Sequence, residues 1–327
     1  MADWARDTHG IGPMREIVVC GEALVDVVST TAPGADPSRL PPLQPALGGG
    51  PFNVAITLGR LGSAVSFCSA VSTDTYGDAI MAALAAGGVG TTLVQRRAEP
   101  TSLALATIGS DGAAHYSFYV EGTADRLVSE PGDFASTVSA VCFGTLSMVL
   151  EPGASVYERV MRRAHDAGRL IALDPNIRSA VIDDPDFYRR RFLDWIPMID
   201  VLKLSDEDVD WLGAGADGSS VDDWLHEGAG VVVITHGGDG ISVRTSEFSI
   251  LAQAPVTDVV DTIGAGDSVL GGLLHFFDDS GALTASAIRS QDADFWTRAA
   301  EYAARVAAVT VSRPGADPPW SSELTRP

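Results

Sequence analysis

Lysine is almost absent from this sequence of 327 residues, in which Lys203 is the only one among 22 basic residues. A Walker-type phosphate-binding loop needs the pattern G-K-[ST], and the sequence contains no such pattern. A catalytic lysine of the protein-kinase type, or one that forms a Schiff base, would have to be Lys203. Any phosphate that the protein handles must therefore be held by backbone amides, arginines and a metal ion.

Cysteine is also scarce. The three cysteines, Cys20, Cys68 and Cys142, lie in separate apolar stretches and share no C-x-x-C spacing. This pattern argues against a disulfide framework or a zinc site and favours buried thiols in a reducing compartment. We find no signal peptide and no apolar run long enough to span a bilayer, so we expect a cytoplasmic protein.

Positive charge is in short supply as well. The formal net charge is −21 and the isoelectric point is about 4.4, which argues against nucleic acid or an anionic membrane as a partner. Hydrophobic residues make up 46% of the chain, enough for a sizeable core. We expect residues 1–15 to form a flexible tail ahead of the folded part.

Short apolar runs alternate with segments of helical periodicity along most of the chain. The predicted strands occupy 16–21, 64–71, 138–144, 168–176, 199–205 and 230–238. The predicted helices occupy 53–62 and 77–88, lie near 153–167, 185–196, 206–212 and 220–227, and include a long one that opens 295–320. This alternation predicts an α/β fold whose mostly parallel sheet is covered on both faces.

Two regions break the alternation. Residues 102–122 indicate two strands joined by the turn S-D-G, and residues 24–50 indicate a strand followed by a proline-rich segment. We expect these regions to form a small β-sheet that stands off the main domain and covers a cleft. A further strand pair is predicted at 239–254, as an antiparallel edge.

The segment "VTDVVDTIGAGDSVLGGLLHFF" (256–277) places a tight glycine loop directly before an apolar helix. Small side chains at Gly264, Ala265 and Gly266 would let the backbone amides at the helix start approach an anion. Asp267 then stands where the anion should lie. Taken alone, the simpler interpretation is that Asp267 caps the helix.

Other polar residues and glycines lie at or close to the ends of predicted strands. The segments are "LGGGPFNVA" with Asn53, "GEALVDVV" with Asp26, "LDPNIRSAV" with Asp174, Asn176 and Arg178, "KLSDEDVDWL" with Lys203, and "VITHGGDGI" with Thr235, Gly237 and Gly240. Each alone could be a turn or a helix cap. Ligands of open α/β sheets bind at the carboxyl ends of strands, so we expect these groups to meet there.

Taken together, these segments resemble the ribokinase or PfkB family of carbohydrate kinases, and most of all its bacterial fructokinase branch. The motif D-T-x-G-A-G-D is complete at 261–267, and glycine-glycine-x-x-x-asparagine stands at 48–53. "GEALVD", "DPNIR", "EGTADRLV" and "SRPGADPP" are also similar to fructokinase segments. The resemblance implies a single ribokinase-like domain over 16–327, a three-layer α/β/α sandwich with a small β-sheet lid at about 24–48 and 98–126.

The resemblance also implies roles. Asp267 would be the general base, the amides of Gly264, Ala265 and Gly266 an anion hole, and Arg178 a contact of the substrate or the moving phosphate. Sugar hydroxyls would meet Asp26, Gly49, Gly50, Asn53 and Asn176. The ATP side would comprise Lys203, Ser205, Thr235, Gly237 and Gly240.

A metal site is implied at a motif that departs from the family pattern. The family often carries N-x-x-E to organise Mg²⁺ through water, and the matching positions here are Ser205 and Asp208, with Glu207 as the competing candidate. The expected cofactors are ATP and Mg²⁺, with K⁺ near Asp261 and the turn at 312–316 as a further option. The expected partners are a small sugar, ATP and a second copy of the chain that pairs through the lid.

The acceptor stays open among several classes. D-fructose, phosphorylated on its primary hydroxyl, is our first hypothesis, and 2-keto-3-deoxygluconate, ribose or a nucleoside are the alternatives within the same fold. An NAD-dependent oxidoreductase would need G-x-G-x-x-G after the first strand, where the sequence has "CGEALVD" instead. A sugar- or nucleotide-binding protein without catalysis is the alternative from a different class.

Overall fold

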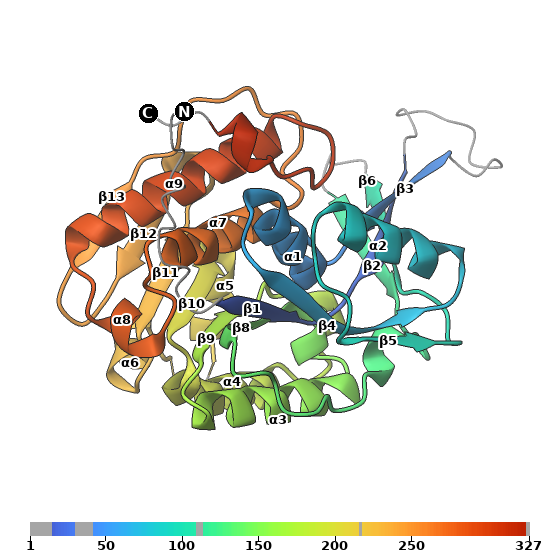
Figure 1. The fold of residues 1–327 in the computed structure, drawn as a ribbon, viewed down its shortest axis with the longest axis horizontal. Helices are drawn as coiled ribbons and strands as arrows, with labels where there is room; N and C mark the ends of the chain where they lie inside the picture. Colours follow the sequence, from blue (N-terminus) through green and yellow to red (C-terminus); the bar gives the residue numbers. More distant parts are fainter. Residues whose placement is uncertain (1–14, 30–41, 109–113, 216–217, 325–327) are drawn as a thin grey trace, which may run out of the picture.

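The computed structural model describes residues 15–29, 42–108, 114–215 and 218–324, which form two β-sheets with helices around the larger one (Figure 1). The larger sheet has nine strands in the order β13-β12-β11-β10-β9-β8-β1-β4-β5. Its strands are β1 (Glu16–Cys20), β4 (Val65–Ser72), β5 (Val94–Arg97), β8 (Val138–Gly144), β9 (Leu170–Asp174), β10 (Val201–Ser205), β11 (Val231–Thr235), β12 (Ile241–Arg244) and β13 (Ser249–Ala252).

The central sheet is parallel from β11 to β5, and β12 and β13 add an antiparallel edge. Strands of a parallel sheet are buried on both faces and therefore read as continuous apolar runs, as in "VVVIT" of β11. The predicted parallel sheet and its antiparallel edge at 239–254 are both confirmed.

Helices form one layer on each face of this sheet (Figure 1). One layer contains α1 (Gly50–Leu61), α2 (Thr75–Ala86), α7 (Ala265–Asp279), α8 (Ala285–Arg289) and α9 (Ala293–Val311). The other contains α3 (Gly153–Asp166), α4 (Pro185–Trp195), α5 (Asp206–Gly213) and α6 (Val221–His226). The predicted three-layer α/β/α architecture is confirmed.

Three helices begin earlier than the apolar periodicity predicted, among them α9, which starts at Ala293 instead of 295. The helix expected at 53–62 starts at Gly50, because Pro51 fits the first turn and needs no hydrogen-bond partner for its nitrogen. The helix expected at 77–88 starts at Thr75, because the side chain of Asp74 accepts the N–H of Gly77 and caps it. A proline in the first turn and a capping aspartate, rather than the first apolar residue, set the boundaries of α1 and α2.

A second sheet has the order β3-β2-β6-β7, with β2 (Leu24–Ser29), β3 (Leu43–Gly48), β6 (Leu103–Ile108) and β7 (Ala114–Tyr119). It confirms the small sheet predicted from 24–50 and 102–122, although its β2–β6 pair is parallel. The S-D-G turn, most of the proline-rich segment and the tail at 1–14 lie outside the described residues.

The small sheet has two different faces because successive side chains of a strand alternate. Asp26 is the register partner of Ala104, and Ala104 of Phe118, so these three lie on one face. Val27 and Leu105 are partners on the opposite face. The first face lines the cavity described below, and the second faces away from it.

The sheet topology brings the functional segments together. Strands β1, β8, β9, β10 and β11 run parallel, so their carboxyl ends meet at one edge, where the small sheet and the start of α7 also lie (Figure 1). Among the described residues, no helix is long and apolar enough to cross a membrane.

Candidate active site

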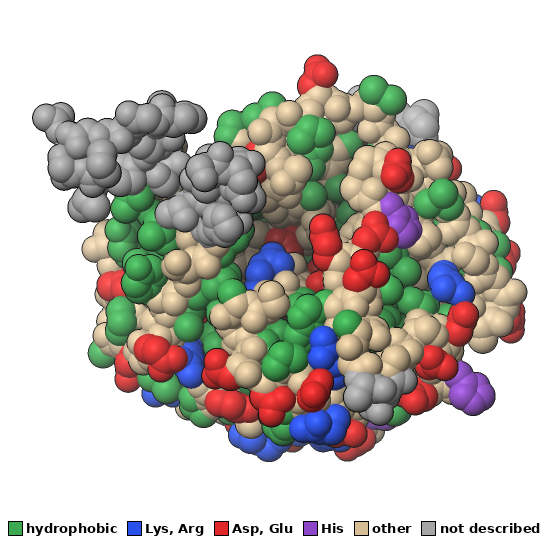
Figure 2. All heavy atoms as spheres, turned by 180° about the vertical axis from the view of Figure 1, so that it is seen from behind, with side chains coloured by type: hydrophobic (Ala, Val, Ile, Leu, Met, Phe, Trp, Pro, Cys, Tyr) green, Lys and Arg blue, Asp and Glu red, His purple; other side chains and the backbone are tan. Residues whose placement is uncertain are grey.

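A cavity of about 660 Å³ opens at this edge, between the central sheet and the small one. Figure 2 shows the molecule hollowed here, with acidic side chains gathered beside the opening. Fifteen of the predicted site residues line it: Asp26, Gly49, Gly50, Asn53, Asn176, Arg178, Lys203, Ser205, Glu207, Asp208, Thr235, Gly264, Ala265, Gly266 and Asp267. The expectation that these segments meet at the strand ends is confirmed.

Two glycines of the loop before α7 have close neighbours where a side chain would begin. Gly264 caps the helix with φ 75°, and a Cβ there would lie 2.6 Å from the Cβ of Ala316. A Cβ on Gly266 would lie 2.6 Å from the Nζ of Lys203. The amides at the start of α7 therefore form the cavity wall, at the helix end that favours anions.

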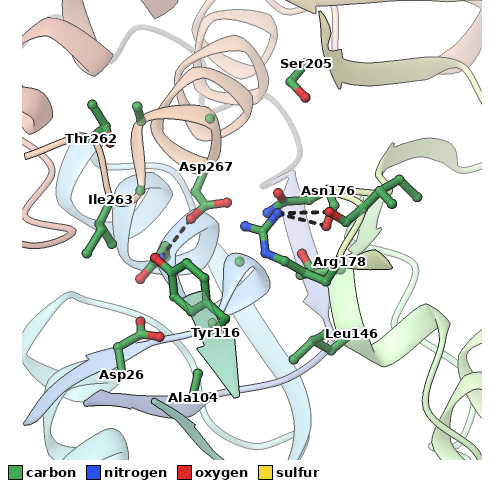
Figure 3. Close-up of a pocket in the computed structure, with 18 of the residues that line it drawn as sticks. Asp26, Ala104, Tyr116, Leu146, Asn176, Arg178, Ser205, Thr262, Ile263 and Asp267 are labelled. Carbon is green, nitrogen blue, oxygen red and sulfur yellow. Dashed lines mark hydrogen bonds between the residues drawn. The ribbon is translucent and has the colours of Figure 1, made fainter. Parts of the chain in front are cut away.

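Asp267 does not cap its own helix, so that simpler interpretation is wrong. The N-cap of α7 is Gly264, which offers no side-chain hydrogen bond. Asp267 is buried, and its Oδ2 accepts a hydrogen bond from Nδ2 of Asn53 at 2.8 Å. Asn53 therefore fixes the direction in which the Asp267 carboxylate faces the cavity (Figure 3).

Burial governs the protonation of this carboxylate. It raises the pKa of Asp267, while the Asn53 hydrogen bond and the charges of Lys203 and Arg178 lower it. The result is an aspartate that takes up a proton more readily than usual and has a cavity in front of it. A general base for proton transfer needs these two properties.

Asp26 approaches the same space from β2 of the small sheet. Burial and the charge of Asp267 raise its pKa to about 6, opposed by Arg178. Its Oδ2 lies where a side chain on Gly48 would begin, because a Cβ there would be only 2.0 Å away. Tyr116 from β7 lies beside Asp26 and Asp267 in Figure 3, so the small sheet supplies both a polar and an aromatic wall.

Arg178 extends into the cavity from the turn after β9, as Figure 3 shows. Its Nη1 donates to the backbone oxygens of Asn176 at 3.4 Å and Ile177 at 3.2 Å. Among the described residues, no carboxylate forms a salt bridge with it. The guanidinium is thus the cation of this cavity that keeps most of its donors for a ligand.

Lys203 is committed to a buried ion pair. Its Nζ lies 2.9 Å from Oδ2 of Asp174, and both side chains are buried. Burial alone would lower the pKa of Lys203, but the surrounding carboxylates, Asp174 first among them, raise it. Burial also raises the pKa of Asp174 to about 6, against the opposing effect of Lys203. The ammonium lies directly under Gly266. It adds positive charge to the loop of Gly264, Ala265 and Gly266 before α7, which we call the anion loop.

The two predicted metal residues have different surroundings. Asp208 is buried; its Oδ1 accepts the N–H of Ile177 at 2.7 Å, and its Oδ2 accepts the N–H and the hydroxyl of Ser205 at 2.8 Å each. Glu207 is exposed at the cavity rim, with no hydrogen bond or ion pair to another described residue. Asp208 holds the backbone in place, and Glu207 has both oxygens available.

Gly237 and Gly240 lie in a neighbouring cavity of about 460 Å³. Thr235, Thr262, Ala265 and Gly266 border both cavities, so the two meet at the anion loop. The second cavity is largely apolar, with Val256, Val259, Ala304 and Val311 in its wall. One cavity is therefore polar and the other apolar, and the loop that can hold a phosphate lies between them.

Sequence reasoning missed several residues of the cavity wall, three of which carry polar groups on the side away from the anion loop. Glu22 is buried inside "GEALVD", Thr145 follows β8, and Tyr116 lies in the small sheet. Only Glu22 carried a usable signal, because a carboxylate directly after a buried strand needs a partner.

Comparisons with known proteins agree with this geometry. A model of the pfkB family of carbohydrate kinases matches residues 14–323. A fructokinase of Rhizobium leguminosarum bv. trifolii is 34% identical over 279 residues, which is 84% of this chain and 84% of that one. Among solved structures, a fructokinase with bound ATP from Xylella fastidiosa gives a TM-score of 0.82 at 27% identity and covers 93% of this chain and 94% of that chain.

A more distant structure shares the fold. A double mutant of fructokinase from Vibrio cholerae O395, in fructose, ADP and potassium ion bound form, gives a TM-score of 0.77 at 21% identity, over 93% of this chain and 94% of that one. The fold, the anion loop and the matches above define a sugar phosphotransferase. The chain belongs to the pfkB family of carbohydrate kinases, as the motif at 261–267 predicted.

The ion pair under the anion loop generates a stability prediction. Lys203→Met should lower the free energy of unfolding by about 3–5 kcal/mol, because Asp174 would be left buried without its cation. The double variant with Asp174→Asn should recover a large part of this loss. Urea unfolding at pH 7 measures both. Arg298→Met, which removes an exposed pair, is the matched control and should change the free energy by less than about 1 kcal/mol. Equal effects of Lys203→Met and the control would contradict the prediction.

Proposed function

We propose that the protein transfers the γ-phosphoryl group of ATP to the primary hydroxyl of a neutral sugar, D-fructose, to give fructose 6-phosphate. One observation carries the proposal: Asp267, oriented by Asn53 at 2.8 Å, stands beside the anion loop where the polar and apolar cavities meet. ATP would place its base in the apolar cavity and its phosphates over the loop. The sugar would occupy the polar cavity.

The proposed reaction uses side chains and backbone amides of this chain. The sugar oxygen forms a bond to the γ-phosphorus, the bond from that phosphorus to the bridging oxygen breaks, and ADP leaves. Asp267 accepts the proton of the attacking hydroxyl. The amides of Gly264, Ala265 and Gly266, with Lys203 beneath them, stabilise the charge on the moving group, and Arg178 approaches it from the sugar side.

The charge of the cavity supports a neutral acceptor. Asp26, Asp267 and Glu22 line the sugar side, where Arg178 is the free cation among the described residues. A carboxylate sugar such as 2-keto-3-deoxygluconate would be repelled by these acids. Asp26, Asn53 and Asn176 offer hydrogen-bond partners for hydroxyls. Ribose or a nucleoside is the alternative acceptor, and binding without turnover is the alternative from a different class.

Mg²⁺ fits the residues at the rim. It prefers oxygen ligands and keeps several waters, so one or two carboxylates and the phosphates of the nucleotide are sufficient. Glu207 supplies free oxygens, and Asp208 holds the same turn. The ion would neutralise charge on the phosphates when bound.

We further propose K⁺ near Asp261. The oxygens of Asp261 accept the N–H groups of Ile263 at 3.0 Å and Gly315 at 2.8 Å, and so join the loop to the turn at 312–316. The bound potassium ion of the Vibrio cholerae protein motivates this site.

We propose that the small sheet is the lid of a single domain over 16–327 and also the dimer surface. Its outward face carries Val27, Pro45, Leu103, Leu105 and Tyr119, which is apolar enough to pair with a second copy. The cytoplasm is the proposed compartment, because three free cysteines are buried and ATP is the proposed donor.

The reaction is tested with a panel of sugars, sugar acids and nucleosides in an ADP-release assay. D-Fructose with ATP and Mg²⁺ should give the highest kcat/KM.

Asp267→Asn should keep ATP binding and lose about 10²–10⁴-fold in kcat, because it removes the base. The wild-type rate should fall with decreasing pH from a point above the ordinary range of an aspartate, since the pKa of Asp267 is raised. Turnover of no acceptor, or full activity of Asp267→Asn, would sink the proposal.

The metal assignment predicts two separable defects. Glu207→Gln should raise the Mg²⁺ concentration needed for half-maximal activity by about 10-fold or more and leave the melting temperature unchanged. Asp208→Asn should lower the free energy of unfolding by about 1–2 kcal/mol, because it weakens the cap on α5. Chelation by EDTA should abolish activity reversibly. The assignment is wrong if Glu207→Gln has a normal Mg²⁺ response.

The dimer proposal concerns the outward face of the lid. Leu105→Glu should convert a dimer to a monomer in light scattering after gel filtration, because a charge would be buried between the two sheets. Phe187→Glu is the matched control, since Phe187 is 52% exposed on α4. A monomeric wild-type protein, or a dimer that tolerates Leu105→Glu, counts against this surface.

A further inference from the structure

Two described residues other than glycine have positive φ, Thr145 at 57° and Asn176 at 41°. They follow the neighbouring strands β8 and β9, and both line the sugar side of the cavity. Asparagine tolerates this left-handed region, but a β-branched threonine is strongly disfavoured there. Residues held in such conformations cluster at binding and catalytic sites, where the surrounding structure keeps them in place.

The structure shows what holds Thr145. The hydroxyl of Ser147 donates to the backbone oxygen of Gly144 at 2.5 Å, which closes the turn around Thr145. The N–H of Ser147 donates to Oε2 of Glu22 at 3.0 Å. Glu22 is 1% exposed and follows β1, so it ties the turn to the neighbouring strand of the sheet.

Glu22 is also unusual by itself. Its second carboxylate oxygen, Oε1, is buried and has no hydrogen-bond partner among the described residues. Burial raises the pKa of Glu22 to about 7, with a smaller contribution from the charge of Asp125. A buried acid with one free oxygen is costly, and it persists here at the back of the cavity wall.

The hydroxyl of Thr145 lies close to the base. A Cβ built on Gly50 would be 2.4 Å from Oγ1 of Thr145 and 3.3 Å from Oδ1 of Asp267. These two oxygens therefore flank the same point of the cavity wall, and the absence of a side chain at Gly50 leaves room between them. Within the described part of the chain, no hydrogen bond involves the Thr145 hydroxyl.

We propose that Thr145 is a substrate-binding residue whose hydroxyl contacts an acceptor hydroxyl next to the reacting one, and that Glu22 is the positioning residue that holds its turn through Ser147. The proposal rests on the proposed function and specifies a contact within it. It explains why a threonine is kept in a disfavoured conformation. It also predicts that stability and binding respond to substitution in opposite directions.

The test measures KM for sugar, KM for ATP and melting temperature in Thr145 variants of the full chain. Thr145→Val keeps the shape and loses the hydroxyl, so KM for the sugar should rise about 3- to 10-fold, the equivalent of one neutral hydrogen bond, while KM for ATP stays unchanged. Thr145→Ser keeps the hydroxyl and should stay close to wild type. Thr145→Gly should raise KM as Thr145→Val does, with a melting temperature no lower than that of wild type, because the strain is removed.

Variants of Glu22 test the positioning role. Glu22→Gln retains an acceptor for the N–H of Ser147 and should leave KM for the sugar within about twofold of wild type. Glu22→Leu should raise it, and combining Glu22→Leu with Thr145→Val should add little, because both act through one contact. An unchanged sugar KM in Thr145→Val, or additive effects in the double variant, would overturn this inference. Absence of sugar turnover in wild type would instead refute the proposed function.

Discussion

The site depends on keeping several buried carboxylates stable in one small volume. Asp208, Asp267 and Glu22 line the polar cavity, and Asp174 lies behind it, where it pairs with Lys203. An isolated buried charge costs several kcal/mol, so each acid needs a donor or a cation. Asn53 is the partner of Asp267, Ser147 of Glu22, Ser205 of Asp208 and Lys203 of Asp174. These partners come from α1, from the turn after β8 and from β10. The acids are therefore stabilised only when the sheet is assembled, which makes the fold a condition for the charge pattern.

Close backbone approach is the second constraint, and it follows from the first. The acids and their partners occupy space that side chains would otherwise fill at three glycines. A Cβ on Gly48 would meet Asp26, one on Gly50 would meet Thr145, and one on Gly266 would meet Lys203. A side chain at any of these positions would displace the neighbouring polar group, while at Gly264 the positive φ is a conformational reason for glycine.

The sequence predicted the parts of the site that are local in the chain. The anion loop and Asp267 fall within one motif, and the strand ends follow from apolar runs, so the meeting of these segments could be expected. The partnerships were not predictable in the same way. Lys203 and Asp174 are 29 residues apart and meet because β9 and β10 are neighbours. Glu22 meets Ser147 across 125 residues, through the pairing of β1 with β8.

The positive φ of Thr145 could not be predicted from the sequence either. Thr145 has no local signal for positive φ, because threonine disfavours it and the cause lies in Ser147, Glu22 and Gly50. Asp208 presented the opposite problem. Its position in the motif suggested a metal residue. The sequence did not predict its hydrogen bonds to Ser205 and Ile177, which hold the backbone at the start of α5.

The charges around Asp267 also affect whether the phosphoryl group of ATP is transferred to the sugar or to water. Burial raises the pKa values of both Asp26 and Asp267, and Arg178 opposes the shift in each case. Arg178 is bound here by two weak backbone contacts, so a phosphate could draw it away from the acids. The acids would then lose a compensating charge unless sugar hydroxyls replaced it with hydrogen bonds. In the proposed reaction, the base would therefore hold its proton more readily with nucleotide alone than with nucleotide and sugar together, which favours transfer to the sugar over hydrolysis.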